Sequence, residues 1–296
     1  MTIHLAGIKL KDYCGFRNTA LNFLNENDKP RKITVIYGPN GVGKSSLIKS
    51  IQLVSNPFLY QYKNTAEQFQ KLVYNNNYSP GYMSVFLEAG GVSPYHMQVQ
   101  AAFEDGTDLF KIVTLEQQGL IECDLEKKNK GYAYSIDADN PMNLSKFQLA
   151  DTYKDIFLDM ANTVYGFDCK LEESIEDSIE DESGIKQLVE IYTDFTINKN
   201  GTTVHFKSMS AGEKKVAKLL SALCNPDYID NLDIVLIDNV ELHVYYKRHA
   251  DMIDKIIEHF PNKQFIVTSH SETLINYVGQ KYGIDALLDL EKIKEM

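Results

Sequence analysis

A glycine-rich segment, residues 38–45, has the spacing G-x-x-x-x-G-K-S that is typical of a nucleotide phosphate site. Glycines allow such a backbone to curl so that successive N–H groups point at phosphate oxygens, and the helix that follows adds positive potential at its start. The ammonium group of Lys44 is expected to reach the β- and γ-phosphates, and the hydroxyl of Ser45 to bind Mg²⁺. The predicted phosphate-binding residues are Gly38, Asn40, Gly41, Gly43, Lys44, Ser45 and Ser46.

An acidic residue that ends an apolar run is a second candidate for this site. Residues 234–237, Ile-Val-Leu-Ile, read as a buried strand, and Asp238 follows directly. Buried strands that end in Asp are common, and many of them are structural, so this pattern alone is weak. Together with the phosphate segment, it predicts that Asp238 and Ser45 hold Mg²⁺.

A third candidate lies at the start of a helix. In the segment Ser-Met-Ser-Ala-Gly-Glu-Lys-Lys, residues 208–215, Ser210 and Glu213 have the S-x-x-E spacing of a capping box, which would begin an ordinary helix. A Ser and a Gly at a helix N-terminus also suit an anion. We therefore predict that Ser210 and Gly212 contact the γ-phosphate of a nucleotide held by another subunit.

A histidine follows another apolar run. Residues 265–271 read Phe-Ile-Val-Thr-Ser-His-Ser, which places His270 after the carboxyl end of a buried strand. A lone histidine is usually structural, but ligands bind at the carboxyl ends of strands in open α/β sheets. We predict that His270 senses the γ-phosphate. Among the other six histidines, His243 is the best candidate because it follows Asp238 closely.

Alternating strands and helices are expected to position these residues. Continuous apolar runs predict buried parallel strands at residues 33–37, 234–237 and 265–268. The helical spacing of apolar residues predicts helices at residues 44–54, 211–223, 245–260 and 272–278. This alternation is typical of an α/β fold class with a parallel core sheet.

The other segments predict an antiparallel patch and additional helices. Strands are expected at residues 3–10 and 21–23, and further β-like runs with hairpin-type turns between them occur at residues 83–87, 96–103, 110–115 and 132–136. Helices are expected at residues 65–74 and 145–165, with Ser145 as the N-cap of the second. The pair Asn200-Gly201 predicts a hairpin between residues 195–197 and 203–206.

The composition is that of an acidic globular chain. Its 296 residues include 30 Lys and Arg against 41 Asp and Glu, so the formal net charge is 30 − 41 = −11. Residues 172–182 hold seven of the acids and no Lys or Arg, and we interpret them as a solvated loop or helix face, or else as a docking site for a basic partner. Net charge argues against broad binding of nucleic-acid phosphates, but it does not exclude a local site.

Cysteine usage and hydropathy predict the compartment. Four scattered cysteines without a C-x-x-C pair predict neither a disulfide framework nor a zinc site. Neither a run of about 18 apolar residues nor a secretory signal is present, so no membrane span is expected. We expect a cytoplasmic protein.

In their order, the motifs resemble those of ATP-binding-cassette (ABC) type ATPases. They are most similar to the branch that holds the structural-maintenance-of-chromosomes (SMC) proteins, RecF-like ATPases and the overcoming-lysogenization-defect family. The matching segments are the opening strands at residues 8–23, the phosphate segment 38–45, the signature-like residues 209–214 and the switch-like residues 268–271. The match is good over residues 1–55 and 195–280 and poor between them.

This resemblance implies one ABC-type head over residues 1–296. Residues 1–55 and 195–296 would form the nucleotide-binding core, and residues 56–194 would form the antiparallel patch with a helical, acidic insertion. No long heptad run predicts a coiled coil. The resemblance further implies a head-to-tail homodimer, or a higher homo-oligomer, that sandwiches ATP and Mg²⁺ and opens again on hydrolysis.

Small members of this branch often act in bacterial or phage defence beside a nuclease or toxin. We therefore expect an ATPase whose nucleotide state controls a partner effector. The alternative is a RecF-like DNA-repair ATPase that binds DNA structures. A P-loop kinase or GTPase is disfavoured, because the signature-like and switch-like segments would have no role in it.

The sequence departs from the family pattern at one position. Residues 238–243, Asp-Asn-Val-Glu-Leu-His, align with the family's Asp-Glu-Pro-Glu-Leu-His, so Asn239 replaces the Glu that orients the attacking water. An amide can hold a water molecule but cannot accept its proton, and positioned proton transfer contributes about 10²–10⁴ in rate. Either Glu241 takes over as the base and turnover is slow, or hydrolysis is nearly lost and ATP holds a closed dimer.

Overall fold

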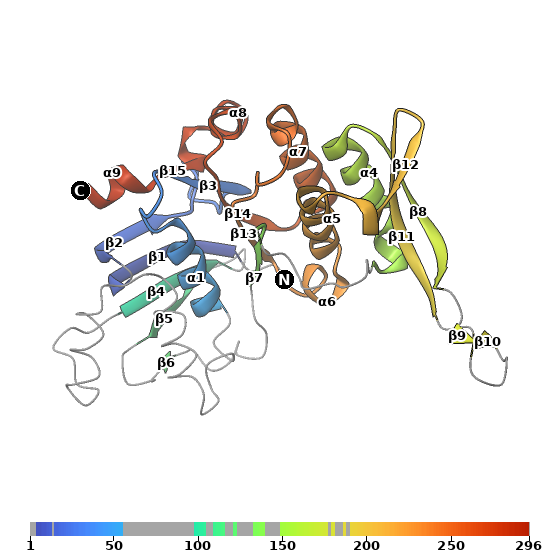
Figure 1. Cartoon of the computed structure of the whole chain (residues 1–296). Helices are drawn as coiled ribbons and strands as arrows, with labels where there is room; N and C mark the ends of the chain where they lie inside the picture. Colours follow the sequence, from blue (N-terminus) through green and yellow to red (C-terminus); the bar gives the residue numbers. More distant parts are fainter. Residues whose placement is uncertain are drawn as a thin grey trace, which may run out of the picture. The chain divides into compact units, whose positions relative to one another are not determined.

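A computed structural model of the chain describes residues 4–13, 15–55, 98–104, 109–115, 121–122, 133–139, 149–176, 179–180, 186–187 and 190–295. The chain divides into two compact units. The first comprises residues 1–135, 232–240 and 262–296, and the second comprises residues 136–231 and 241–261. Figure 1 labels the elements of both.

A five-stranded sheet with a parallel centre is the framework of the first unit. Its order is β15 (Leu287–Asp289), β3 (Ile33–Tyr37), β14 (Gln264–Thr268), β13 (Ile234–Asp238) and β7 (Ala133–Asp137). β3, β14 and β13 pair in parallel, as does β15 with β3. The residues of β14 are all buried, which explains why it reads as a continuous apolar run rather than an alternating one. The three predicted parallel strands are confirmed.

An antiparallel sheet accompanies it in the same unit. Its order is β2 (Phe16–Asn22), β1 (His4–Tyr13), β4 (Gln98–Glu104), β5 (Leu109–Leu115) and β6 (Ile121–Glu122). The predicted runs at residues 96–103 and 110–115 are thus confirmed as an antiparallel pair, to which the N-terminal strands also belong. The assignment of residues 132–136 to this patch is wrong. β7 lies beside β13 instead, and its Ala133 is buried in the common core.

Among the described residues, three helices belong to the first unit: α1 (Lys44–Ser55), α8 (Glu272–Tyr282) and α9 (Leu290–Glu295). A 3₁₀ turn, η6 (Ile284–Ala286), lies between the last two helices. The predicted helices at residues 44–54 and 272–278 are confirmed, and α8 begins with Ser271 as a side-chain N-cap. The helix at residues 65–74 and the strand at residues 83–87 lie outside the described residues.

Both sheets and α1 contribute to one hydrophobic core. Its fully or almost fully buried members include Leu5, Leu10, Phe16, Phe23, Ile36, Leu47, Ile51, Leu236, Ile266 and Leu290. Burial of side chains of this size is worth about 1.5–3 kcal/mol each before the entropy of folding is counted. The core therefore fixes α1, and the segment that precedes it, against the parallel sheet.

The second unit combines an antiparallel sheet with helices. The sheet has the order β12 (Thr202–His205), β11 (Glu190–Lys199) and β8 (Asp168–Glu176), and two short strands, β9 (Ile179–Glu180) and β10 (Lys186–Gln187), pair separately. Asn200 and Gly201 join β11 to β12 with φ of 52° and 87°, which confirms the predicted hairpin. The helices are α4 (Lys154–Tyr165), α5 (Ala211–Leu223), α6 (Pro226–Ile229) and α7 (His249–His259), with 3₁₀ turns η3 (Asp151–Tyr153), η4 (Phe206–Ser208) and η5 (Tyr246–Arg248).

Three sequence predictions differ from this unit. The helix expected at residues 145–165 begins only at Lys154, because Ala150 is extended with φ −70° and ψ 141°; Ser145 lies outside the described residues. The helix expected at residues 245–260 begins at His249, after the η5 turn. The acidic segment is neither loop nor helix up to Glu176, because β8 pairs with β11 along its length. Glu172 and Glu173 are nevertheless exposed, as a charged edge requires.

The helices of the described residues include none that is both long enough and apolar enough to cross a bilayer.

A buried amide joins the two sheets of the first unit. Gln264 is 1% exposed; its Oε1 accepts from the N–H of Leu5 over 2.7 Å, and its Nε2 donates to the carbonyl of Leu5 over 3.0 Å. The register of β1 with β4 shifts between Leu5 and Gly7, so this side chain serves backbone groups at an irregular point of the ladder. It therefore ties the start of β1 to the first residue of β14.

We expect Gln264→Leu to lower the free energy of unfolding by about 2–4 kcal/mol, because two buried backbone groups would lose their partner. Urea denaturation followed by circular dichroism measures this change. The control is Gln280→Leu, at an exposed position of α8, with an expected effect within about 0.5 kcal/mol. Equal effects of the two substitutions would contradict the role of Gln264.

Candidate functional site

The phosphate segment lies between β3 and α1, as its motif requires. Gly38, Gly41 and Gly43 adopt φ of 140°, 79° and 104°, which side chains with a Cβ rarely tolerate. Lys44, at the start of α1, is only 6% exposed and donates from Nζ to the carbonyls of Gly38 and Pro39, each over 2.9 Å. The loop therefore curls around the ammonium group of its own lysine.

The remaining residues of this segment differ in exposure. Asn40 and Gly41 are exposed, Ser45 is half-buried and Ser46 is 9% exposed. The tip of the loop is thus exposed, whereas its lysine is buried. These features fit a nucleotide, because a buried ammonium and a backbone held open by glycines both suit a polyanion.

The topology brings the other first-unit candidates to the same edge of the sheet. β14 lies between β3 and β13, and all three run parallel, so their carboxyl ends meet at one edge. Gly38 follows β3, Asp238 ends β13, and His270 follows β14. The N–H of Ser269 donates to the carbonyl of Ile36 over 3.1 Å, which fixes the end of β14 beside the phosphate segment. His270 is exposed there.

A threonine of the switch-like segment, to which its sequence motif assigns no separate role, organises this edge. Thr268 is fully buried; its hydroxyl donates to Oδ1 of Asp238 over 2.5 Å and accepts from the N–H of Asn239 over 2.7 Å. Its carbonyl accepts from the N–H of Val240 over 3.1 Å. One residue of β14 thus fixes the carboxylate and the two residues after it. The signal in the sequence was its position at the end of an apolar run, two residues before His270.

Asn239 occupies a left-handed backbone conformation, with φ of 55°. Asparagine is several times more frequent there than most residues that carry a Cβ. A Glu would fit this conformation less well, which gives a local reason for an amide at the position where the family pattern has Glu.

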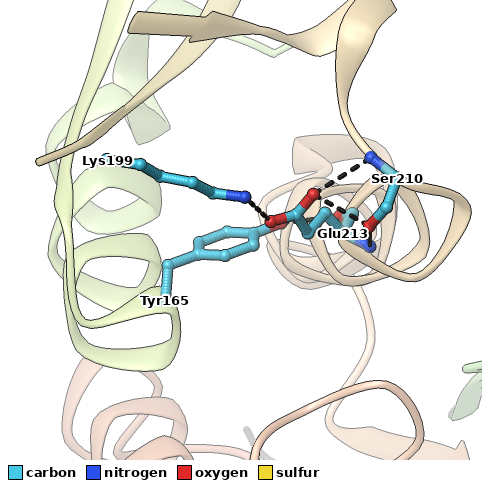
Figure 2. Close-up of polar contacts among 4 residues, drawn as sticks. All are labelled: Tyr165, Lys199, Ser210 and Glu213. Atoms are coloured by element: carbon cyan, nitrogen blue, oxygen red, sulfur yellow. Dashed lines mark hydrogen bonds and ion pairs between the residues drawn. The ribbon is translucent and has the colours of Figure 1, made fainter. Parts of the chain in front are cut away.

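The signature-like residues lie in the second unit, at the start of α5. Ser210 is the N-cap: its hydroxyl accepts from the N–H of Glu213, and its own N–H donates to Glu213 Oε2 over 3.0 Å, so the predicted capping box is confirmed. Lys199 pairs with Glu213 Oε1, and Tyr165 donates to the carbonyl of Glu213 over 2.6 Å. Figure 2 shows Glu213 at the centre of these contacts.

The carboxyl group of Glu213 is held in its charged form. Burial acts to raise its pKa, but the hydrogen bonds from Lys199 and Ser210 outweigh burial and hold the pKa below its usual value. The ionised side chain of Glu213 therefore binds the start of α5 to Lys199 of β11, and the backbone carbonyl of Glu213 binds it to Tyr165 of α4.

A histidine from the loop after β13 contacts the signature-like segment within the second unit. His243 has φ of 67°, and a Cβ built on Gly212 would lie 3.4 Å from its Nδ1. Oδ1 of Asp139 accepts a hydrogen bond from Nζ of Lys215 over 2.5 Å and lies 3.4 Å from Nε2 of His243. The hydrogen bonds from Lys215 and then His243 lower the pKa of Asp139. No sequence pattern pointed to Asp139, which is distant along the chain from both partners.

Glu241 also belongs to the second unit, whereas Asp238 and Asn239 belong to the first. Glu241 is 9% exposed, and its carbonyl accepts from the N–H of Val244 over 3.1 Å. The predicted site residues are thus divided between the units, with Ser210, Gly212 and Glu241 in the second and the others in the first.

Comparison with known proteins agrees with this geometry. Residues 33–166 and 157–276 match the family described as "AAA domain, putative AbiEii toxin, Type IV TA system". The chain belongs to this family. The matched residues include the phosphate segment, both strands that carry Asp238 and Thr268, and the start of α5.

Two curated relatives of this AAA-domain protein are similar over shorter stretches. It is 32% identical over 117 residues to "Retron Vc95 probable ATPase" of Vibrio cholerae serotype O1 biovar El Tor. The matched stretch covers 36% of this chain and 23% of the relative. It is 31% identical over 97 residues to "Retron Ec83 probable ATPase" of Escherichia coli, covering 30% of this chain and 18% of the relative. The matched stretch thus spans less than a quarter of either relative.

The fold is that of an SMC head. The "SMC head domain from Thermotoga maritima" superimposes with a TM-score of 0.53 at 16% identity, covering 93% of this chain and 92% of that one. The predicted α/β P-loop fold of ABC type, with a parallel core sheet and additional antiparallel strands, is confirmed. The chain is related to probable ATPases, and its family is described as an AAA domain.

We expect Thr268→Val to lower the free energy of unfolding by about 1–3 kcal/mol, because the N–H of Asn239 and Oδ1 of Asp238 would both lose a partner, whereas Thr268→Ser retains most of the stability. Thr34 is the matched control. It is fully buried on the adjacent β3, and its hydroxyl has no hydrogen-bond partner among the described residues, so Thr34→Val should be neutral or stabilising. Chemical denaturation measures all three; similar losses at both threonines would contradict the role given to Thr268.

Proposed function

We propose that this AAA-domain protein binds ATP with Mg²⁺, dimerises head to tail around the nucleotide, and thereby controls a partner effector in bacterial or phage defence. The observation that carries the proposal is the common sheet edge at which the phosphate segment, Asp238 and His270 meet. ATP binding agrees with the family and with the retron ATPases that this chain resembles.

The residues present fit the nucleotide and its metal ion. Gly38, Asn40, Gly41, Gly43, Lys44, Ser45 and Ser46 would hold the phosphates. Ser45 and Asp238 would bind Mg²⁺, which supplies positive charge between the β- and γ-phosphates when it is bound. Thr268 holds Oδ1 of Asp238 and so directs the carboxylate. His270, exposed at the same edge, would contact the γ-phosphate.

Dimerisation is proposed because the signature-like residues suit an anion, and we assign to them the phosphate of a nucleotide that is bound by a second subunit. Ser210 is exposed, and the 13 residues of α5 place a complete helix behind it. In this capped first turn the Ser210 hydroxyl accepts from the N–H of Glu213, which leaves the N–H groups of Ala211 and Gly212, without intrahelical partners, for a phosphate. Ser210 and Gly212 would therefore contact the γ-phosphate bound by the partner subunit.

Hydrolysis is proposed to be slow and to depend on Glu241 as the base. Asn239 would orient the water but cannot accept its proton. The buried position of Glu241 suits a base that is shielded from solvent. The competing possibility is that ATP serves only to hold a closed dimer.

The effector and the defence role are proposed from the family and from the related ATPases. The family description refers to a toxin of a type IV toxin–antitoxin system, and the similar ATPases belong to retrons. We propose that the partner is a toxin or a nuclease. It would be encoded beside this chain and act with it in the cytoplasm.

We expect Mg²⁺-ATP to shift the protein from monomer to dimer in size-exclusion chromatography with light scattering. Lys44→Ala should abolish ATP binding and the shift, whereas Ser210→Arg should abolish the shift and leave ATP binding by the monomer intact. Lys49→Ala, on the same helix as Lys44, is the control and should behave as the wild type. If neither ATP nor Lys44→Ala changes the oligomeric state, the proposal of ATP-driven dimerisation is contradicted.

We expect Glu241→Gln to lower steady-state ATPase activity about 10²–10⁴-fold while ATP binding and dimerisation persist, since the proton acceptor is lost. Asn239→Gly retains the left-handed backbone and should lower the rate far less. Release of inorganic phosphate measures both. If wild-type activity is absent, or Glu241→Gln leaves it unchanged, ATP acts as a structural ligand rather than a substrate.

A further inference from the structure

The last helix of the described chain packs against the phosphate segment. A Cβ built on Gly38 would lie 3.6 Å from the backbone N of Glu291 and 3.9 Å from Cβ of Leu290. These residues begin α9, which follows β15 directly. Residues at the far end of the sequence thus form one wall of the loop.

One cation of this helix reaches the loop's last glycine. Lys294 Nζ lies 4.2 Å from the centroid of the Phe16 ring. A Cβ on Gly43 would lie 3.1 Å from the same Nζ and 3.2 Å from Cε2 of Phe16. The ammonium group is therefore held beside the residue that immediately precedes Lys44, between an aromatic face and the phosphate-binding backbone.

The position of Lys294 is fixed by packing around it. Leu290 is fully buried in the core of the first unit, and Ile293 packs against that core. The strand before the helix pairs with the strand before the loop, with Asp289 opposite Tyr37. Because both the loop and α9 follow paired strands, Lys294 and Gly43 are positioned by the same sheet.

We propose that Lys294 is a phosphate-binding residue of the nucleotide site, acting with Lys44 on the phosphate chain of ATP. This inference rests on the proposed nucleotide function. Phe16 is fully buried, so its ring holds the ammonium group beside the loop in the absence of nucleotide, and a hydrogen bond between two charged groups is among the strongest in proteins. The four-carbon stem of lysine lets the ammonium group move from the Phe16 ring to a phosphate oxygen without movement of the helix.

The arrangement explains two features of the loop. Phe16 and Lys294 leave little room for a side chain at position 43, in addition to the positive φ that favours glycine there. A second ammonium group beside the loop also raises the local positive potential in a chain whose net charge is −11.

The test is titration of the full chain with a fluorescent ATP analogue in the presence of Mg²⁺. We expect Lys294→Gln to weaken binding about tenfold, equivalent to about 1.4 kcal/mol, and Lys294→Arg to retain most of the affinity. The loss should shrink as NaCl is raised, because the contribution is coulombic. Lys292→Gln is the matched control: Lys292 lies on the same helix, is 78% exposed and pairs with Asp289, so its substitution should leave affinity unchanged.

Thermal unfolding without nucleotide separates binding from folding: Lys294 is partly exposed, and Lys294→Gln should leave the midpoint within about 5 °C of the wild type. Equal affinities of wild type and Lys294→Gln, with binding abolished by Lys44→Ala, would overturn the role of Lys294 and leave the nucleotide site in place. Binding that also persists in Lys44→Ala would overturn the proposed function itself. A tenfold loss that Lys292→Gln reproduces would assign the effect to net charge and overturn the specific contact.

Discussion

The parallel pairing of β14 with both β3 and β13 is the constraint on which the candidate site depends. It brings three segments separated by up to about 230 residues to one edge of the sheet, where each strand ends in a residue suited to phosphate or metal chemistry. Thr268 converts this proximity into a fixed geometry, because its hydroxyl and carbonyl hold Asp238, Asn239 and Val240. Without that threonine, the carboxylate would still be near the loop, but its orientation would depend on its own rotamer.

Local signals predicted much of the fold. The helix at residues 211–223, its capping box and the hairpin at Asn200-Gly201 were all found, because each depends on residues within a few positions of one another. Pairing over long separations was not found. β1 pairs with β4 almost one hundred residues later, β7 joins the parallel sheet, and Gln264 bonds to Leu5 across 259 positions. No periodicity encodes such partners, because burial and the pairing of backbone groups with distant parts of the chain select them.

The same distinction applies to the site. The residues of the motifs were predicted because their chemistry is visible as residue type and spacing. The residues that support them, Thr268, Asp139 and Lys199, are ordinary residues whose roles arise from contacts with partners elsewhere in the chain. The acidic segment was predicted correctly in its exposure but wrongly in its backbone structure. Glu172 and Glu173 are exposed to solvent, as their charge predicted. They nevertheless lie on a strand, because an edge strand can present carboxylates to water and still keep its backbone hydrogen bonds to the neighbouring strand.

The division of the chain gives the loop after β13 a particular place. The first unit ends at Val240, which is fully buried and bonded to the carbonyl of Thr268, and the second resumes at Glu241. A few residues later, His243 contacts Gly212 at the start of α5. Only a few residues of chain therefore separate Asp238, which is proposed to hold Mg²⁺, from His243, which lies beside Gly212 within the second unit. The covalent path from Asp238 to His243 therefore passes through Val240, a residue that is fully buried and hydrogen-bonded to the carbonyl of Thr268 in β14.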